Sequence, residues 1–209
     1  MEKADIPLWL KWAREIEAIG QTGLHFSRDV FDRTRYQCLI GIASEILAQY
    51  SSIPEEKFVQ TFLSQEGYAT PKVDVRAAVF KEDKILMVQE RLDGDWSIPG
   101  GYADVNDRPS AMVEREVMEE SGFIVKAYKL AGVYESNHNR VPLTVFHAYK
   151  LVFLCELVGG EGRPGDETLA VDFFGLDQLP PLSTTRVTRR IIEEAFAHSH
   201  DPLRLAAFD

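Results

Sequence analysis

The chain has 209 residues, of which 45% are hydrophobic and 27% charged, a composition typical of globular proteins. It contains no run of about 18 apolar residues, so we expect no membrane partner. Its 33 Asp and Glu residues outnumber 23 Lys and Arg residues, giving a formal net charge of −10. We therefore expect no nucleic-acid partner, because an acidic surface repels phosphate backbones. Two cysteines are too few for a disulfide framework, which favours a cytoplasmic location.

The first 66 residues predict helices and no strands. Apolar residues recur at helical spacing in a first helix, which Gly20 would cap at its C-terminus. These apolar residues are Trp9, Trp12, Ala13, Ile16 and Ile19. A second helix has a longer stripe, for which Asp29 and Asp32 are the candidate N-caps. The stripe consists of Tyr36, Leu39, Ile40, Ala43, Ile46, Leu47 and Tyr50. We expect the aromatic residues of both helices to pack mainly in a helical core.

A third, short helix is expected after Ser52. Ser52 and Glu55 have the spacing of a capping box, and Phe58 and Phe62 give the helix one apolar face. Three short helices cannot bury all of these apolar faces among themselves, so the faces pack either on the rest of the chain or on a second subunit. The sequence therefore predicts a helical N-terminal domain over residues 1–66, and we favour a homodimer as the commonest solution for such surfaces.

The pattern of the sequence changes after this leader. Alternating apolar residues predict a strand over 73–79, and a tight turn at 81–84 leads into a second strand over 85–88. Further strands are expected near 128–134, 144–157 and 170–174, and helices over 110–121 and 184–196. This order of strands and helices predicts that residues 67–209 form an α/β domain, a sandwich built on a mixed sheet.

Three carboxylates share one face of the helix expected over residues 110–121. Glu116, Glu119 and Glu120 stand at i, i+3 and i+4, where like charges destabilise a helix by about 0.2–0.5 kcal/mol per pair. Gly122 is expected to cap this helix, so two of the carboxylates also face the unfavourable end of the helix dipole. A solvated acidic face is one interpretation. We favour a site for a hard divalent cation such as Mg²⁺, which prefers carboxylate oxygens and commonly accompanies phosphate.

The segment around this helix resembles the signature of the Nudix hydrolases, the MutT-like superfamily. The fixed positions of the signature are occupied here by Gly101, Asp107, Arg115, Glu116, Val117, Glu119, Glu120, Gly122 and Phe123. Two positions depart from the family pattern, because Asp107 replaces a glutamate and Phe123 replaces an aliphatic residue. The resemblance implies that the three glutamates of the helix bind metal. Asp107 would either reach metal through water or cap the helix.

The resemblance extends beyond the signature. Trp96–Gly101 is similar to the segment that precedes it in many members, and Gly175–Pro180 to the family's late strand-to-helix turn. The helical leader is similar to the subgroup that includes CDP-choline pyrophosphatases. The resemblance implies a Nudix-type α/β/α sandwich that hydrolyses CDP-choline to CMP and phosphocholine, with two or more Mg²⁺ or Mn²⁺ ions per site. ADP-ribose or another nucleotide sugar is the alternative substrate, and a non-catalytic ligand sensor is the alternative role.

The resemblance also implies roles for individual residues. Glu116 and Glu120 are expected to bind metal, and Glu119 to polarise water as a ligand or general base. Arg115 is expected to orient a neighbouring glutamate by a charge-assisted hydrogen bond. Glu167 lies in a glycine-rich loop where many members supply one more metal-binding carboxylate. A solvated loop glutamate is the alternative interpretation of Glu167.

Three further residues are candidates for binding the substrate. Gly101 belongs to the signature itself. Arg76 points away from the valine face of the first strand, where it would contact a phosphate or else form an ion pair with Asp74 or Glu90. Glu90 ends the second strand and is expected to approach metal or substrate.

Overall fold

The computed structural model describes residues 6–136 and 145–209, which divide into two compact units. The helical unit consists of the described residues up to Pro71 together with Val145, Phe146 and His147. The α/β unit consists of the other described residues from Lys72 onward. The strand expected from residue 144 begins at Ala148, and residue 144 itself lies outside the described part of the chain, as do residues 1–5.

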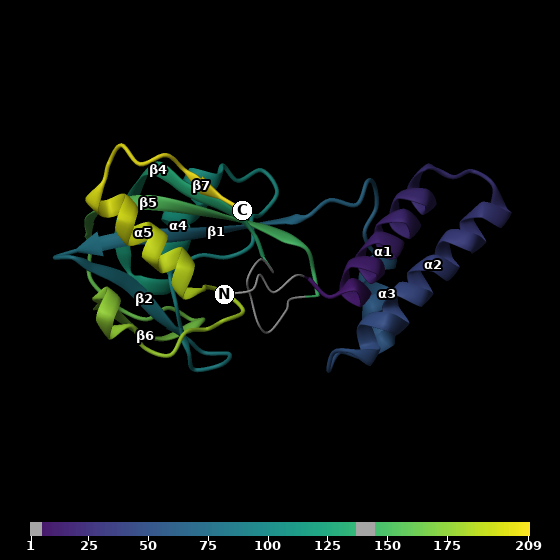
Figure 1. Cartoon of the computed structure of the whole chain (residues 1–209), viewed down its shortest axis with the longest axis horizontal. Coiled ribbons are helices and arrows are strands. Elements are labelled where there is room, and N and C mark those ends of the chain that lie inside the picture. The colour runs from purple at the N-terminus through teal and green to yellow at the C-terminus, as the bar shows by residue number, and fades with distance from the viewer. Residues whose placement is uncertain (1–5, 137–144) are drawn as a thin grey trace. The chain divides into compact units, whose positions relative to one another are not determined.

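The helical unit contains α1 (Leu8–Phe26), α2 (Val30–Gln49) and α3 (Glu55–Leu63). Asp29 is the N-cap of α2, as predicted, because its Oδ1 accepts hydrogen bonds from the N–H groups of Phe31 and Asp32 at 2.9 and 3.0 Å. The expectation that Gly20 caps α1 is wrong. Gly20 lies inside α1, where a Cβ would approach Ile40 Cγ1 to 2.7 Å, so this glycine allows the close packing of α1 on α2 seen in Figure 1.

The start of α3 differs from the prediction. The N-cap is Pro54, so the expected capping box at Ser52 is wrong. Phe58 and Phe62 are buried, as their spacing predicts. Both rings contact Phe146, with centroid separations of 6.5 and 6.2 Å, which explains why the segment around Phe146 belongs to the helical unit.

The outer side of α1 carries large apolar side chains. Trp12 was expected in the helical core, but it is 54% exposed. Leu8, Ile19 and Phe26 are also exposed and, with Trp12, recur along α1 at intervals of four and seven residues. We call these four residues the α1 stripe. The core side of the helix is formed by residues such as Leu10, so the stripe remains uncovered within the helical unit.

The α/β unit is built on a seven-stranded mixed sheet. Its strands are β1 (Lys72–Lys81), β2 (Lys84–Glu90), β3 (Trp96–Ser97), β4 (Phe123–Glu135), β5 (Ala148–Gly160), β6 (Thr168–Phe174) and β7 (Ala207–Phe208). The order is β3-β2-β1-β5-β4-β7, and β6 pairs with β2. β1 runs parallel to β5 and antiparallel to β2. Glu82 and Asp83 have positive φ angles of 50° and 58°, typical of the tight hairpin turn predicted between β1 and β2.

Helices cover both faces of the sheet. On one face, Val113 and Val117 of α4 (Pro109–Ser121) pack with Val75 of β1. On the other face, α5 (Arg189–His200) packs with Ala78 of β1, and Figure 1 shows α5 crossing the sheet. Alternate residues of β1 thus enter two cores, which confirms the predicted α/β/α sandwich. A short 3₁₀ helix, Leu176–Gln178, precedes α5.

The start of α5 differs from the prediction. α5 begins at Arg189 instead of residue 184, because Thr188 is its N-cap and accepts a hydrogen bond from the N–H of Ile191.

Among the described residues, none of the helices is long and apolar enough to cross a membrane.

Candidate active site

The end of α4 brings the three predicted glutamates together. Gly122 has a φ of 73° and caps the helix, as expected. Glu116, Glu119 and Glu120 line one side of a cavity of about 750 Å³. Glu120 is buried, Glu116 is half-buried and Glu119 is exposed. The helix therefore presents three carboxylates to the same cavity at different depths.

A turn over residues 99–101, which we call the glycine turn, fixes the carboxylate of Glu120, the most buried of the three. The segment that contains Pro99 and Gly101 runs beside β1, since the N–H groups of Ala77 and Val75 donate to their carbonyls at 2.8 and 2.9 Å. The N–H of Gly100 donates to Glu120 Oε2 at 2.9 Å. These bonds hold the turn against the buried end of α4.

The next glycine of the turn leaves room for a second carboxylate. A Cβ on Gly101 would lie 3.1 Å from Glu116 Oε2, so the bare backbone here permits the close approach of that glutamate. The structure therefore places Gly101 beside Glu116, but Gly101 is not among the described residues that line the cavity, so a substrate contact there stays a prediction.

Burial opposes the charge on two of these glutamates. It raises the pKa of Glu120 to about 8, although Arg76 and the Gly100 N–H act in the opposite direction. Burial also raises the pKa of Glu116, against the attraction of Arg115. A divalent cation would favour the ionised form of both groups. The hard oxygen donors of α4 therefore fit a hard divalent cation.

Arg115 links the outer carboxylates of the site. Its Nη1 lies 3.2 Å from Glu116 Oε1 and 3.0 Å from Glu119 Oε2, in keeping with the expected orienting role. Its Nη2 lies 3.0 Å from Asp107 Oδ2. Asp107 does not cap α4, whose N-cap is Arg108, so that alternative is wrong. The short Asp107 side chain contacts Arg115 instead.

The structure shows these carboxylates bound to Arg115 and not grouped around a cation. Within residues 6–136 and 145–209, no group of three or more His, Cys, Asp or Glu side chains has the arrangement of a metal site. The guanidinium of Arg115 contacts both Glu116 and Glu119, so binding a cation would require these side chains to exchange that contact for the metal.

The structure places Arg76 behind the glycine turn. Its Nε and Nη2 donate to the two carboxylate oxygens of Asp74 at 2.8 and 3.2 Å, and its Nη1 lies 3.4 Å from the carbonyl of Ile98. Lys150 also donates to Asp74. Burial raises the pKa of Asp74, but the two cations outweigh it and lower the pKa overall. Of the two ion pairs considered, Arg76 forms the one with Asp74.

Glu90 interacts electrostatically with Glu120 of the site. It is buried and forms an ion pair with Arg186 Nε at 3.1 Å, and burial raises its pKa despite the nearby Arg186. Arg186 contacts Asp93 Oδ2 at 3.3 Å as well. Among the described residues that line the cavity, neither Glu90 nor Arg76 is present. Any effect of these two residues on a ligand in the cavity would therefore act through their charge.

A loop that follows β5 lines the cavity together with α4. We call residues 161–167 the carboxylate loop, because Asp166 and Glu167 line the cavity with the helix glutamates. The N–H of Gly165 donates to the carbonyl of Glu120 at 3.3 Å, and the N–H of Arg163 donates to that of Ser121 at 2.9 Å. The loop thus uses the free carbonyls at the end of α4, and it brings Glu167 to the predicted glutamates.

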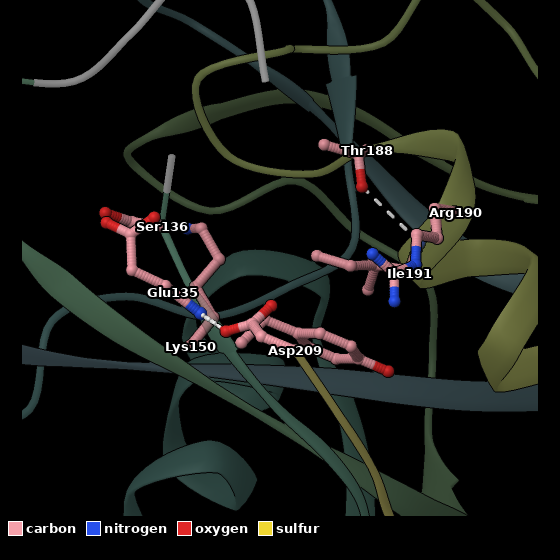
Figure 2. A pocket seen from close by; sticks show the side chains of 8 residues that line it. Glu135, Ser136, Lys150, Thr188, Arg190, Ile191 and Asp209 are labelled. Carbon is pink, nitrogen blue, oxygen red and sulfur yellow. Dashed lines mark hydrogen bonds between the residues drawn. The ribbon is translucent and has the colours of Figure 1, made fainter. Parts of the chain in front are cut away.

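A second hollow of the α/β unit is too small to bind a nucleotide. Figure 2 shows that it lies where β4 and β5 approach the start of α5. Lys150, Thr188 and Arg190 contribute to its wall, and Asp209 Oδ2 accepts a hydrogen bond from the N–H of Glu135. Its volume of about 20 Å³ has room for about one water molecule. The cavity at α4 is therefore the candidate active site.

Comparison with known proteins identifies the family. Residues 70–195 match the Nudix domain, and residues 7–62 match a domain described as the UDP-X-like, N-terminal oligomerisation domain. The chain belongs to the Nudix family. This confirms the family, and with it the enzyme class that the signature predicts, a pyrophosphohydrolase. The match over residues 7–62 also supports the helical leader expected from the sequence.

Nudix relatives resemble this chain along most of its length. A Bacillus subtilis protein, provisionally named ADP-ribose pyrophosphatase YjhB, is 39% identical over 96% of this chain and 97% of its own. The crystal structure of a UDP-X diphosphatase is 34% identical, with a TM-score of 0.62 over 96% of this chain and 98% of that one. A Streptococcus suis ADP-ribose pyrophosphatase structure is 41% identical, with a TM-score of 0.62 over 67% of this chain and 100% of its own.

Proposed function

We propose that this Nudix hydrolase cleaves the pyrophosphate bond of a nucleoside diphosphate linked to a second moiety. Mg²⁺ or Mn²⁺, with two or more ions per site, would be held by Glu116, Glu119, Glu120 and Glu167. The observation that supports the proposal is that one cavity is lined by all four of these carboxylates. Nucleotides are recognised with such ions because the pyrophosphate charge must be neutralised before a nucleophile can approach.

The residues of the site have separate tasks in this proposal. When bound, divalent cations neutralise phosphoryl oxygens and lower the pKa of the attacking water. The Gly100 N–H fixes one oxygen of Glu120, which leaves the other free to act as a ligand. Arg115 orients Glu116 and Glu119 through its paired donors. Glu119 is the most exposed of the three and is our candidate for accepting the proton of water, as ligand or general base.

The proposed substrate-binding residues act around this centre. We assign Gly101 to substrate binding, because its lack of a side chain leaves space beside Glu116. Arg76 and Glu90 are buried, so we propose that they act on the substrate through their charge and without direct contact. The positive charge of Arg76 offsets the repulsion that Glu90 and Glu116 exert on Glu120. Glu90 itself forms an ion pair with Arg186.

The similar proteins order the candidate substrates. ADP-ribose is the first to test, because a relative named for it aligns over 96% of this chain. A UDP-linked compound is the second, favoured by the match of the helical leader and by the UDP-X diphosphatase structure. CDP-choline, the substrate expected from the sequence resemblance, remains the third. A non-catalytic sensor is disfavoured because all three inner carboxylates of the signature are retained.

We also propose that the chain works as two parts, a helical domain over residues 1–66 and a catalytic domain over residues 67–209, and that the helical domain forms a homodimer. The match to an oligomerisation domain and the exposed α1 stripe support this assembly. A cytoplasmic location is proposed as well, since Cys38 and Cys155 are both free thiols.

Product analysis tests the proposed activity. The full-length protein is incubated with ADP-ribose, a UDP-sugar or CDP-choline and saturating Mg²⁺, and the products are identified by mass spectrometry. We expect a nucleoside monophosphate and a second phosphorylated product, such as AMP and ribose 5-phosphate from ADP-ribose. Release of inorganic phosphate without a mononucleotide, or intact substrate in every reaction, would contradict the proposal.

A further inference from the structure

Arg91 bonds three consecutive carbonyls around Glu167. Its backbone N–H donates to the carbonyl of Glu167 at 3.0 Å. Its guanidinium Nε donates to the carbonyl of Asp166 at 2.9 Å, and its Nη2 to that of Thr168 at 3.0 Å. Arg91 follows directly after β2, so it connects the rigid sheet to the end of the carboxylate loop.

The other side of the same loop is fixed to α4. The hydroxyl of Thr168 donates to the carbonyl of Glu120 at 2.8 Å, and it accepts the N–H of Gly165 at 2.8 Å. A Cβ on Gly165 would lie 1.9 Å from the carbonyl oxygen of Glu119, so only glycine permits this approach. The loop is therefore held at two places, by the end of α4 and by Arg91.

Glu167 is exposed and projects into the cavity from between these two anchors. The bond to α4 comes from Thr168, the residue after Glu167. The guanidinium of Arg91 bonds the carbonyls of the residues before and after Glu167. A guanidinium suits this task, because its donors form a planar fork and it stays charged at all working pH values. Without the guanidinium, the carbonyls of Asp166 and Thr168 would lose these bonds, and of the three bonds from residue 91 only that of its backbone N–H would remain, so Glu167 would be held less firmly.

We propose that Arg91 is a positioning residue that holds Glu167 where it can bind a divalent cation beside the α4 glutamates. The inference rests on the proposed function of the cavity, which it deepens by assigning a task to a residue outside the signature. Arg91 acts through the loop backbone and contacts neither substrate nor metal. Its removal should therefore matter only as long as Glu167 is present.

A double-mutant cycle tests this dependence. The variants are Arg91→Ala, Glu167→Gln and the double variant, all made in the full-length protein. We expect Arg91→Ala and Glu167→Gln each to lower kcat by about 10- to 100-fold, with a smaller change in KM, because a displaced ligand affects chemistry more than binding. In the Glu167→Gln background, Arg91→Ala should lower kcat by less than about twofold.

Binding of Mn²⁺ alone, followed by electron paramagnetic resonance without substrate, gives a second measurement. Both single variants should weaken Mn²⁺ binding by a similar factor, and the double variant should be no weaker than either. Arg91→Lys should fall between wild type and Arg91→Ala, because a single ammonium cannot reproduce the fork. If Arg91→Ala does not fold, Arg91→Lys replaces it in the cycle.

Arg189→Ala is the matched control. Like Arg91, Arg189 is an exposed arginine that bonds a backbone carbonyl, that of Leu176 in the 3₁₀ helix, but it lies on α5 and pairs with Glu193. The Arg189→Ala variant should leave kcat and Mn²⁺ binding unchanged.

The proposal is overturned by an undiminished effect of Arg91→Ala in the Glu167→Gln background, or by full Mn²⁺ affinity in either single variant. If wild type hydrolyses no nucleotide, the proposed function fails, and the Mn²⁺ cycle still decides the role of Arg91.

Discussion

The backbone N–H of Gly100 donates to Glu120 Oε2 at 2.9 Å, which joins the glycine turn at the start of the signature to the helix near its end. Gly100 has a φ of 139°, a conformation that side chains disfavour, and a Cβ there would lie 2.0 Å from the carbonyl oxygen of Val75. The turn can approach β1 and Glu120 at once only because the residue is glycine.

Gly100→Ala should therefore destabilise the fold by at least about 3 kcal/mol and lower kcat by at least about 100-fold. Thermal unfolding and steady-state kinetics measure both effects. Gly94→Ala is the control, because Gly94 also has a positive φ, of 78°, but a Cβ there would meet nothing within 4 Å. It should cost about 1 kcal/mol and leave kcat unchanged. Equal effects of the two variants would show that backbone strain alone, and not the contact with β1, matters at Gly100.

Metal removal should abolish hydrolysis. The donors that line the cavity are carboxylate oxygens, which favour Mg²⁺ or Mn²⁺ over Zn²⁺. Treatment with EDTA should stop mononucleotide release, and Mg²⁺ or Mn²⁺ in excess of the chelator should restore it. Rescue by Zn²⁺ alone would mean that another set of ligands holds the metal.

The helical unit should lose stability as the pH rises towards neutrality. Burial raises the pKa of Glu17, on α1, to about 7 from the ordinary 4.5. The folded helix therefore binds this proton more tightly than the unfolded chain, and the stabilisation is complete below about pH 4.5 and lost as the pH rises through about 7. Glu17→Gln should be more stable than wild type at pH 8 by about 1 kcal/mol, after allowance for solvent screening. Hydrogen exchange of the α1 amides measures this difference, which should disappear at pH 4; a difference that persists there would assign it to another cause.

The α1 stripe should carry the dimer contact. Ile19 is exposed in the helical unit, so Ile19→Glu should change the stability of one subunit by less than about 0.5 kcal/mol. It should nevertheless shift the mass measured by light scattering from dimer to monomer, because an uncompensated charge would be buried at the contact. Lys57→Glu adds negative charge at an exposed position of another helix of the same unit, α3, and should leave the mass unchanged. A dimer that survives Ile19→Glu would place the contact elsewhere.

Local patterns predicted the fold well, and also the helix that carries the three glutamates. The helix over 110–121 lies within one residue of α4, because its apolar positions, its carboxylates and the Gly122 cap all act within a few turns. Gly20 was misassigned because a glycine that ends a helix and one that admits a neighbouring helix look alike in sequence. The difference depends on Ile40 of another helix, which local patterns do not specify.

The partners of the site residues were less predictable, because they are distant in the chain. Lys150 reaches Asp74 only because β1 and β5 pair in parallel, and Arg186 reaches Glu90 from the segment before α5. Arg91 was missed for the same reason, since its carbonyl partners belong to a loop that follows β5. The only local signals were charged residues beside a strand end and a glycine-rich loop, and such residues are common on protein surfaces.

The central claim is that the carboxylates of α4 perform the hydrolysis, and the rate of mononucleotide release by Glu119→Gln and Glu120→Gln at saturating Mg²⁺ tests it most directly. Both variants should stay folded, with metal-free stability equal to wild type or higher by tenths of a kcal/mol, since crowding of like charges is relieved. Glu114→Gln is the control, because Glu114 faces β4 and accepts the N–H of Ala127. We predict that the first two variants lose most of kcat while the control retains it. Full activity in Glu119→Gln or Glu120→Gln would contradict the assignment of the active site to α4.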